Sequence, residues 1–205
     1  MRITTGLALT ASLLAAPALA QEEASEAPRG PQGCGAYAAH DDFDFWVGDW
    51  NVYGRDGRFA GQNFISRRSG GCLLLEEWFS AGGGDGTSMN YVDPATGDWR
   101  QIWMSANLYI DYSGGLNAAG QMQLDGEITR FNGEGRSSAA FRGVWTPLAN
   151  GHVIQHFKEY DPEAGTWNDW FLATYVPIEE DPNGAEPGEG ATGPVIEEAP
   201  AFAFE

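Results

Sequence analysis

The feature that most restricts the fold is a succession of short segments, each bounded by residues that favour turns. The clearest boundaries are Asn132-Gly133 and Asn150-Gly151, which separate runs of alternating polar and apolar residues. Asn-Gly favours tight hairpins because both turn positions adopt a positive φ. No stretch shows the 3.6-residue apolar period of an amphipathic helix over a helical length. The chain therefore predicts an all-β fold built from hairpins.

About ten candidate strands follow one another at the spacing typical of sandwiches and up-and-down barrels, roughly 8–12 residues. They are Trp46–Tyr53, Arg58–Arg67, Cys72–Ser80, Thr87–Val92, Trp99–Ser105, Leu108–Ser113, Gln121–Phe131, Arg136–Thr146, His152–Tyr160 and Trp167–Val176. The spacing alone leaves both architectures open.

The first twenty residues differ in composition from the rest. Arg2, an apolar run from Leu7 to Leu14 and the small-x-small triplet Ala18-Leu19-Ala20 predict a signal peptide over residues 1–20. The apolar run is too short to span a bilayer. We therefore expect an exported protein, periplasmic or secreted, without a membrane span.

Two further segments, residues 21–42 and 177–205, are acidic and contain much glycine and proline. Such segments bury too little apolar surface to offset the entropy lost on folding. We expect a flexible acidic leader and a disordered acidic tail around a domain at residues 43–176. The apolar stretch Ala201–Phe204 can either dock on the domain or remain a loose end.

The chain is strongly acidic, with 29 Asp and Glu against 11 Lys and Arg and a formal net charge of −18. Removing residues 1–20 takes away one arginine and no acid, which makes the net charge −19. Such a surface repels nucleic acid and anionic membranes, so neither is an expected partner. By itself the charge favours solubility or a saline habitat over a cationic partner.

Cys34 and Cys72 are the two cysteines of the chain. In an oxidising compartment an even pair favours a disulfide. Their spacing excludes a CxxC redox pair, and two thiols alone do not complete a zinc site. We predict a structural disulfide that ties residues 34–42 to the domain, and no metal site.

Four stretches carry a family resemblance over about residues 43–176. They are FDFWVGDWNVYG, GGCLLLEEW, SMNYVDPATGDWRQIW and VWTPLANGHVIQHF. This run resembles exported bacterial domains of unknown function that open with F-W-x-G-x-W and are regarded as lipocalin-like. Lipocalin-type barrels place the tryptophan of a Gly-x-Trp motif, here Gly48 and Trp50, on the first strand to close one end. The resemblance implies a single antiparallel up-and-down β-barrel of about ten strands, lipocalin/calycin-like, with disordered ends, and it implies no agreed activity.

More remotely, the opening is similar to nitrobindin-type barrels, which bind haem through a histidine near the C-terminus. The strand Trp167–Val176 and the tail contain no histidine, so we expect no cofactor and rank haem as the weakest ligand. That strand also lacks the arginine that lipocalins pack on the Gly-x-Trp tryptophan. Trp50 then needs another cover, and the leader aromatics Tyr37 and Phe43 are candidates.

Strand alternation places one set of aromatic and polar side chains on a common face. We predict a ligand site lined by Glu76, Trp78, Ser88, Asn90, Gln101, Trp103 and Gln155. The alternative is a packed core in which the buried amides bond one another or water. His152 and His156 lie about 13 Å apart along one strand, too far to ligate one metal together.

Three functions remain open from the sequence. The first is a carrier or sensor of a small, largely apolar or aromatic molecule held in the barrel mouth. The second is an enzyme with Glu76 as general acid or base, its pKa raised by apolar neighbours such as Trp78. The third is a structural or interaction module that uses the acidic tail or the outer aromatic residues. Ligand identity and oligomeric state stay open.

Overall fold

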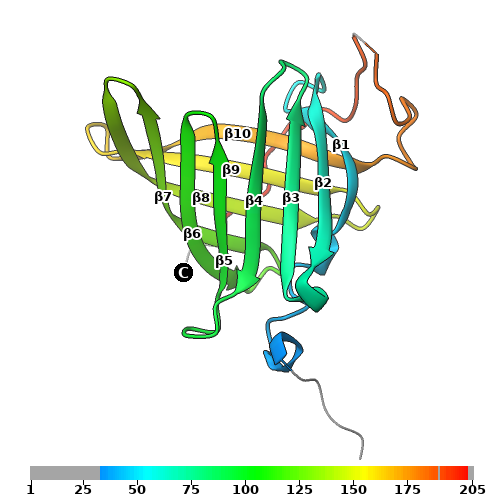
Figure 1. The fold of residues 1–205 in the computed structure, drawn as a ribbon. Coiled ribbons are helices and arrows are strands. Elements are labelled where there is room, and N and C mark those ends of the chain that lie inside the picture. Colours follow the sequence, from blue (N-terminus) through cyan, green and yellow to red (C-terminus); the bar gives the residue numbers. More distant parts are fainter. Residues whose placement is uncertain (1–32, 189, 203–205) are drawn as a thin grey trace, which may run out of the picture.

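The computed structural model describes residues 33–188 and 190–202. These residues form ten antiparallel strands in a closed barrel, in which each strand neighbours the next in sequence and β1 pairs with β10 (Figure 1). The predicted ten-stranded up-and-down barrel is confirmed, and it is consistent with a lipocalin-like barrel. The signal peptide expected at residues 1–20 and most of the leader lie outside the described residues.

The strands agree closely with those expected from the turn signals. They are β1 (Gly48–Gly54), β2 (Phe59–Arg68), β3 (Leu73–Ser80), β4 (Asp85–Val92), β5 (Trp99–Ser105), β6 (Leu108–Leu116), β7 (Met122–Asn132), β8 (Gly135–Pro147), β9 (Val153–Asp161) and β10 (Thr166–Pro177). Three short 3-10 helices are η1 (Gly33–Ala36), η2 (Asp44–Trp46) and η3 (Ser69–Gly71). Because every strand pairs on both sides, the sheet presents no open edge to a second chain.

The first strand begins two residues later than expected, because Trp46 belongs to η2 and folds over the barrel end. Trp46 is fully buried, and the Trp50 indole, 4% exposed, donates to its carbonyl at 3.0 Å. Gly48 has a φ of 154°, and a Cβ there would lie 3.3 Å from the Trp50 ring. The main-chain carbonyl of Trp46 thus fixes the Trp50 indole at this end of the barrel.

Aromatic rings complete this closed end. Phe43 is fully buried and stacks on Trp46 with ring centroids 4.8 Å apart, and its edges meet Trp99 and Trp145. Tyr37 is half-buried against the same cluster. The leader aromatics therefore pack into the ring cluster at this end, whereas the group bonded to the Trp50 indole is the main-chain carbonyl of Trp46.

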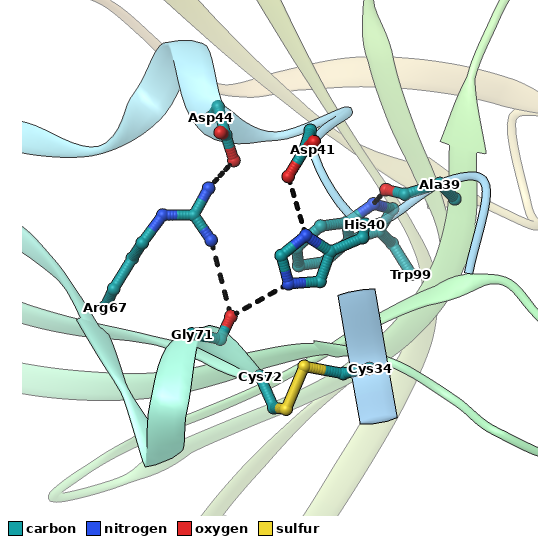
Figure 2. Close-up of polar contacts among 9 residues, drawn as sticks. All are labelled: Cys34, Ala39, His40, Asp41, Asp44, Arg67, Gly71, Cys72 and Trp99. Atoms are coloured by element: carbon teal, nitrogen blue, oxygen red, sulfur yellow. Dashed lines mark hydrogen bonds and ion pairs between the residues drawn. A yellow bond between two sulfur atoms is a disulfide. The ribbon is translucent and has the colours of Figure 1, made fainter. Parts of the chain in front are cut away.

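The predicted disulfide is present between Cys34 of η1 and Cys72, which follows η3, with Cα atoms 5.4 Å apart (Figure 2). Beside it, the His40 ring bonds the Gly71 carbonyl at 3.2 Å. The Trp99 indole donates to the Ala39 carbonyl at 2.8 Å. Covalent and polar contacts together fix residues 33–42 across the closed end.

An ion pair adds a second tie, between η2 and the end of β2. The Arg67 guanidinium contacts the Asp44 carboxylate and also donates to the Gly71 carbonyl at 3.3 Å (Figure 2). Gly71 therefore accepts from β2 and from the leader. Arg67 of β2 thus joins η2, through Asp44, to η3, through Gly71, beside the disulfide.

The described part of the tail differs from the disordered segment expected from its composition. It leaves β10 and runs along the outside of the barrel (orange to red in Figure 1). Asp181, 7% exposed, accepts hydrogen bonds from Asn51 at 2.8 Å and Tyr53 at 2.5 Å. Thr192 forms a β-bridge with Arg58. A few anchors hold the segment although it contains few large apolar residues.

Phe202 is the last of these anchors, and it confirms the docking alternative for this part of the chain. Its ring lies 4.8 Å from the His156 ring on the outer face of β9. The Lys158 ammonium lies 4.7 Å from the Phe202 ring centroid. Apolar contact and a cation over the ring explain why this residue packs while its acidic neighbours remain exposed.

Candidate functional site

A cavity of about 440 Å³ occupies the barrel interior at the end opposite the disulfide. It reaches the surface at the β3–β4 turn, where Gly83, Gly84 and Asp85 are exposed. The volume lies within the range of small-molecule sites, about 300–1,000 Å³. The fully packed interior considered from the sequence is therefore wrong for this half of the barrel.

Seven of the 20 residues that line the cavity are aromatic, and buried polar side chains gather at its inner end. The aromatic lining comprises Trp78, Trp103, Tyr112, Phe157, Trp170, Phe171 and Tyr175. The buried polar lining comprises Asn63, Glu76, Gln101 and Gln155. An apolar wall with a few convergent polar groups is the usual composition of a ligand site.

Most of the residues predicted for the site meet in this cavity. The lining includes Glu76, Trp78, Gln101, Trp103 and Gln155. The other two, Ser88 and Asn90, are buried on β4 outside the lining. Their side chains bond lining residues, so they support the site without facing it.

Glu76 lies at the centre of the polar inner end. Asn63 donates from Nδ2 to Glu76 Oε1 at 2.7 Å, and Ser88 donates from Oγ to Oε2 at 2.5 Å. The strand register explains the second contact, because Glu76 and Ser88 are direct cross-strand partners. Both carboxylate oxygens are thus held by neutral donors.

The hydrogen bonds continue from Glu76 along the barrel wall in the direction of β10. Asn63 Nδ2 also donates to the Tyr175 hydroxyl at 3.0 Å. Tyr175 in turn donates to Gln155 Oε1 at 2.8 Å. Both hydrogens of the Asn63 amide nitrogen are therefore engaged. One chain of hydrogen bonds links side chains of three strands, β2, β10 and β9.

In the other direction the chain of hydrogen bonds crosses β4, β5 and β6. Asn90 donates to the Ser88 hydroxyl at 2.8 Å, and Gln101 donates to the Asn90 carbonyl oxygen. Tyr112 then donates to Gln101 Oε1. Cross-strand pairing of Asn90 with Gln101, and of Gln101 with Tyr112, brings these groups together. The network orients the side chains at the inner end of the cavity.

Burial changes the acid–base behaviour of this end. Glu76 is 3% exposed, and desolvation raises its pKa to about 7, although the hydrogen bonds from Asn63 and Ser88 lower it. Burial, together with the nearby Glu76 charge, raises the pKa of Tyr112 and Tyr175 well above the ordinary value. Glu76 is therefore the group at the cavity that changes charge near neutrality, as the sequence led us to expect.

Asn63 carries a second feature of the inner end. Its carbonyl oxygen Oδ1 is buried and accepts no hydrogen bond from the described residues. A buried oxygen of this kind loses its water without gaining a donor, which costs about 1–3 kcal/mol. The oxygen belongs to the amide whose nitrogen contacts Glu76, so two acceptors are adjacent at the inner end.

Neither His152, just before β9, nor His156 within β9 lines the cavity. His156 faces outward, because its neighbours Gln155 and Phe157 line the cavity, and its Nε2 lies 2.7 Å from Asp169 Oδ1. Among residues 33–188 and 190–202, no group of three or more His, Cys, Asp and Glu is placed to hold a metal ion.

A scan against models of protein families gave no match to this chain. A search of curated proteins found no matching sequence either. Within the described chain, no helix has the length and apolar character needed to cross a membrane. Fold and site together define a class: a closed ten-stranded antiparallel barrel with an aromatic-walled cavity at one end and a buried carboxylate at its inner limit.

Proposed function

We propose that this protein is a periplasmic or secreted carrier or sensor that holds one small, largely apolar molecule in its barrel. The observation that supports the proposal is the cavity of about 440 Å³, with aromatic walls and a polar inner end. Such a cavity gains binding energy from the apolar body of a ligand and orients it through a few polar contacts.

Export is supported by three features. The Cys34–Cys72 disulfide suits an oxidising compartment. Residues 43–176 resemble exported lipocalin-like domains, and residues 1–20 have the composition of a signal peptide. Since the cavity lies at the end opposite the disulfide, residues 33–42 of the leader lie away from the mouth.

The proposal is tested by native mass spectrometry of the protein after incubation with an apolar extract. We expect one added mass per chain, lost when the sample is denatured. The melting temperature of the protein should rise in the presence of the same extract, because a ligand that binds only the folded state stabilises it. An unchanged mass together with an unchanged melt would show that the cavity is not a binding site.

A second candidate function is catalysis with Glu76 as general acid or base. It is favoured by one observation, a carboxyl group with a pKa of about 7 at the end of an accessible cavity. The two functions differ in the fate of the bound molecule: a carrier releases it unchanged and an enzyme releases a product. Mass analysis of the released ligand from the wild type and from Glu76→Gln separates them.

A further inference from the structure

The charge of the cavity points to one class of ligand. Among the described residues that line it, Glu76 and Asp85 are acidic and none is Lys, Arg or His. Glu76 is buried against the neutral donors Asn63 and Ser88. A buried carboxylate without a cation is costly, and a cation delivered to it recovers part of that cost.

The inner end has unused acceptors. A carboxylate offers about four lone-pair positions, and Glu76 uses one at each oxygen. A ligand that fits this end must therefore donate hydrogen bonds, and an ammonium group offers three donors together with a positive charge.

The walls also favour a positive charge. Trp78, Trp103 and Tyr112 line the same cavity, and aromatic faces attract cations through their negative π surfaces. An anionic ligand would meet the Glu76 carboxylate and find no basic side chain among the described lining residues.

We infer that the cavity selects small apolar amines, with the ammonium group at Glu76 and the apolar body against Trp78 and Trp103. This inference rests on the proposed binding function and specifies its ligand class. It gives Glu76 a binding role, in which a bound amine keeps the carboxylate ionised.

Three probes with one ring system and different charges test the inference: 1-naphthylmethylamine, 1-naphthalenemethanol and 1-naphthoate. Calorimetry at pH 8 compares them, because Glu76 is mainly ionised above its pKa of about 7. We expect the amine to bind about 10- to 100-fold more tightly than the alcohol, as hydrogen bonds to charged groups allow. The carboxylate should bind most weakly.

Two matched variants locate the selectivity. Glu76→Gln should remove the preference for the amine while retaining alcohol binding. Glu77→Gln removes the same charge from the adjacent position of β3, which faces the other side of the sheet. The preference for the amine should survive in Glu77→Gln. This variant has the same overall charge as Glu76→Gln but keeps the carboxylate at the cavity.

The wild type alone supplies a test that needs no variant. Below pH 7, affinity for the amine should fall by about tenfold per pH unit, because Glu76 takes up a proton. Affinity for the alcohol should stay level. Tyr112 and Tyr175 face Glu76 but remain neutral in this range. Asp85 at the mouth also attracts the amine, and Glu76→Gln, which keeps Asp85, should show no such fall if Glu76 causes it.

The outcomes separate the two proposals. Equal affinity of the wild type for amine and alcohol overturns the amine inference and leaves the binding function in place. An amine preference that persists in Glu76→Gln also overturns it. If none of the three probes binds, the amine inference fails, and the binding function is decided by the experiment with the apolar extract.

Discussion

Glu76 shows what a single buried ionisable side chain does to the whole protein. Folding moves it from water to an apolar interior, and its pKa rises from 4.5 to about 7. The neutral donors Asn63 and Ser88 moderate the shift without cancelling it. A carboxyl group whose ionisation is unfavourable in the folded protein is thus kept at the inner end of a cavity lined by aromatic residues.

We predict that this shift is visible in the pH dependence of stability. Below pH 4.5 Glu76 is protonated in both states, so its full contribution to the free energy of unfolding is present. Between pH 4.5 and 7 the unfolded chain loses the proton first, and the free energy of unfolding falls by about 3 kcal/mol. Relative to the wild type, Glu76→Gln should therefore gain about 3 kcal/mol between pH 4.5 and 8 in denaturant titrations.

The control for this prediction is Glu77→Gln. The free energy of unfolding of this variant, relative to the wild type, should not show the same change between pH 4.5 and 8. A stability difference between Glu76→Gln and the wild type that is constant from pH 4.5 to 8 would show that the carboxyl group titrates normally in the fold.

Alternation along the chain was enough to predict part of the site. β3 and β5 are regular, so Glu76 and Gln101 fall on the inner face as expected. Asn63 was also predictable, because it shares a face with Gly61 and Ile65 on β2. Alternation fails at the register shift between Asp169 and Phe171, which brings the consecutive residues Trp170 and Phe171 to the cavity.

At the scale of elements, the barrel has a closed end and an open end that are built differently. The closed end is a stack of rings fixed by a disulfide and by hydrogen bonds from the leader (Figure 2). The open end consists of hairpin turns, among them the exposed β3–β4 turn. The turn chemistry predicted the hairpins, whereas the role of Trp46 depends on a short 3-10 helix that strand patterns do not indicate.

We predict that removing the disulfide destabilises the protein without opening the barrel. The bond joins residues 38 positions apart, and loop entropy assigns about 4 kcal/mol to such a link. Cys34→Ser with Cys72→Ser should lower the free energy of unfolding by about this amount, measured with denaturant. Far-ultraviolet circular dichroism should still show the strands.

Reductant provides the control, since it should destabilise the wild type and leave the double serine variant unaffected. Loss of strand signal in the double variant under native conditions would mean that the leader is required for the barrel itself.

We also predict that the mouth of the cavity can be blocked by one substitution at the end of β5. Ser105 lines the cavity, so Ser105→Trp should fill its entrance and reduce ligand binding by at least about tenfold. Met104 is 49% exposed and outside the lining, so Met104→Trp adds the same ring where it cannot reach the ligand. Calorimetry with 1-naphthylmethylamine compares the two; equal loss in both variants would place binding elsewhere.

At the scale of the whole molecule, the tail and the barrel form one structure. Composition failed to predict this because it averages over residues 177–205, whereas the contacts involve a few anchors. Asp181 is held by Asn51 and Tyr53, and Ile196 and Phe202 are buried. Sequence averages detect the lack of a core but not isolated positions that complement the outer face of a barrel.

We predict that Phe202 controls the acidity of His156. Burial lowers the pKa of His156, although the hydrogen bond with Asp169 raises it. Phe202→Ala uncovers the ring, so the pKa should rise towards its ordinary value, followed by nuclear magnetic resonance titration of the imidazole. Val195→Ala changes a tail residue that is 62% exposed and should leave the pKa of His156 as it is in the wild type. An unchanged value in Phe202→Ala would contradict the docked position of the ring.

The pairing of β1 with β10 has a consequence for how the chain reaches its native state. Trp50 lies opposite Pro177, so the hydrogen bonds that close the cylinder join residues at opposite ends of the domain. Such distant pairings slow folding, because the entropy of bringing the ends together is lost before the contact forms. A chain that emerges N-terminus first cannot complete this seam until residue 177 has followed. Until then β1 keeps one unpaired edge, which makes the interval before closure the period of greatest exposure to aggregation.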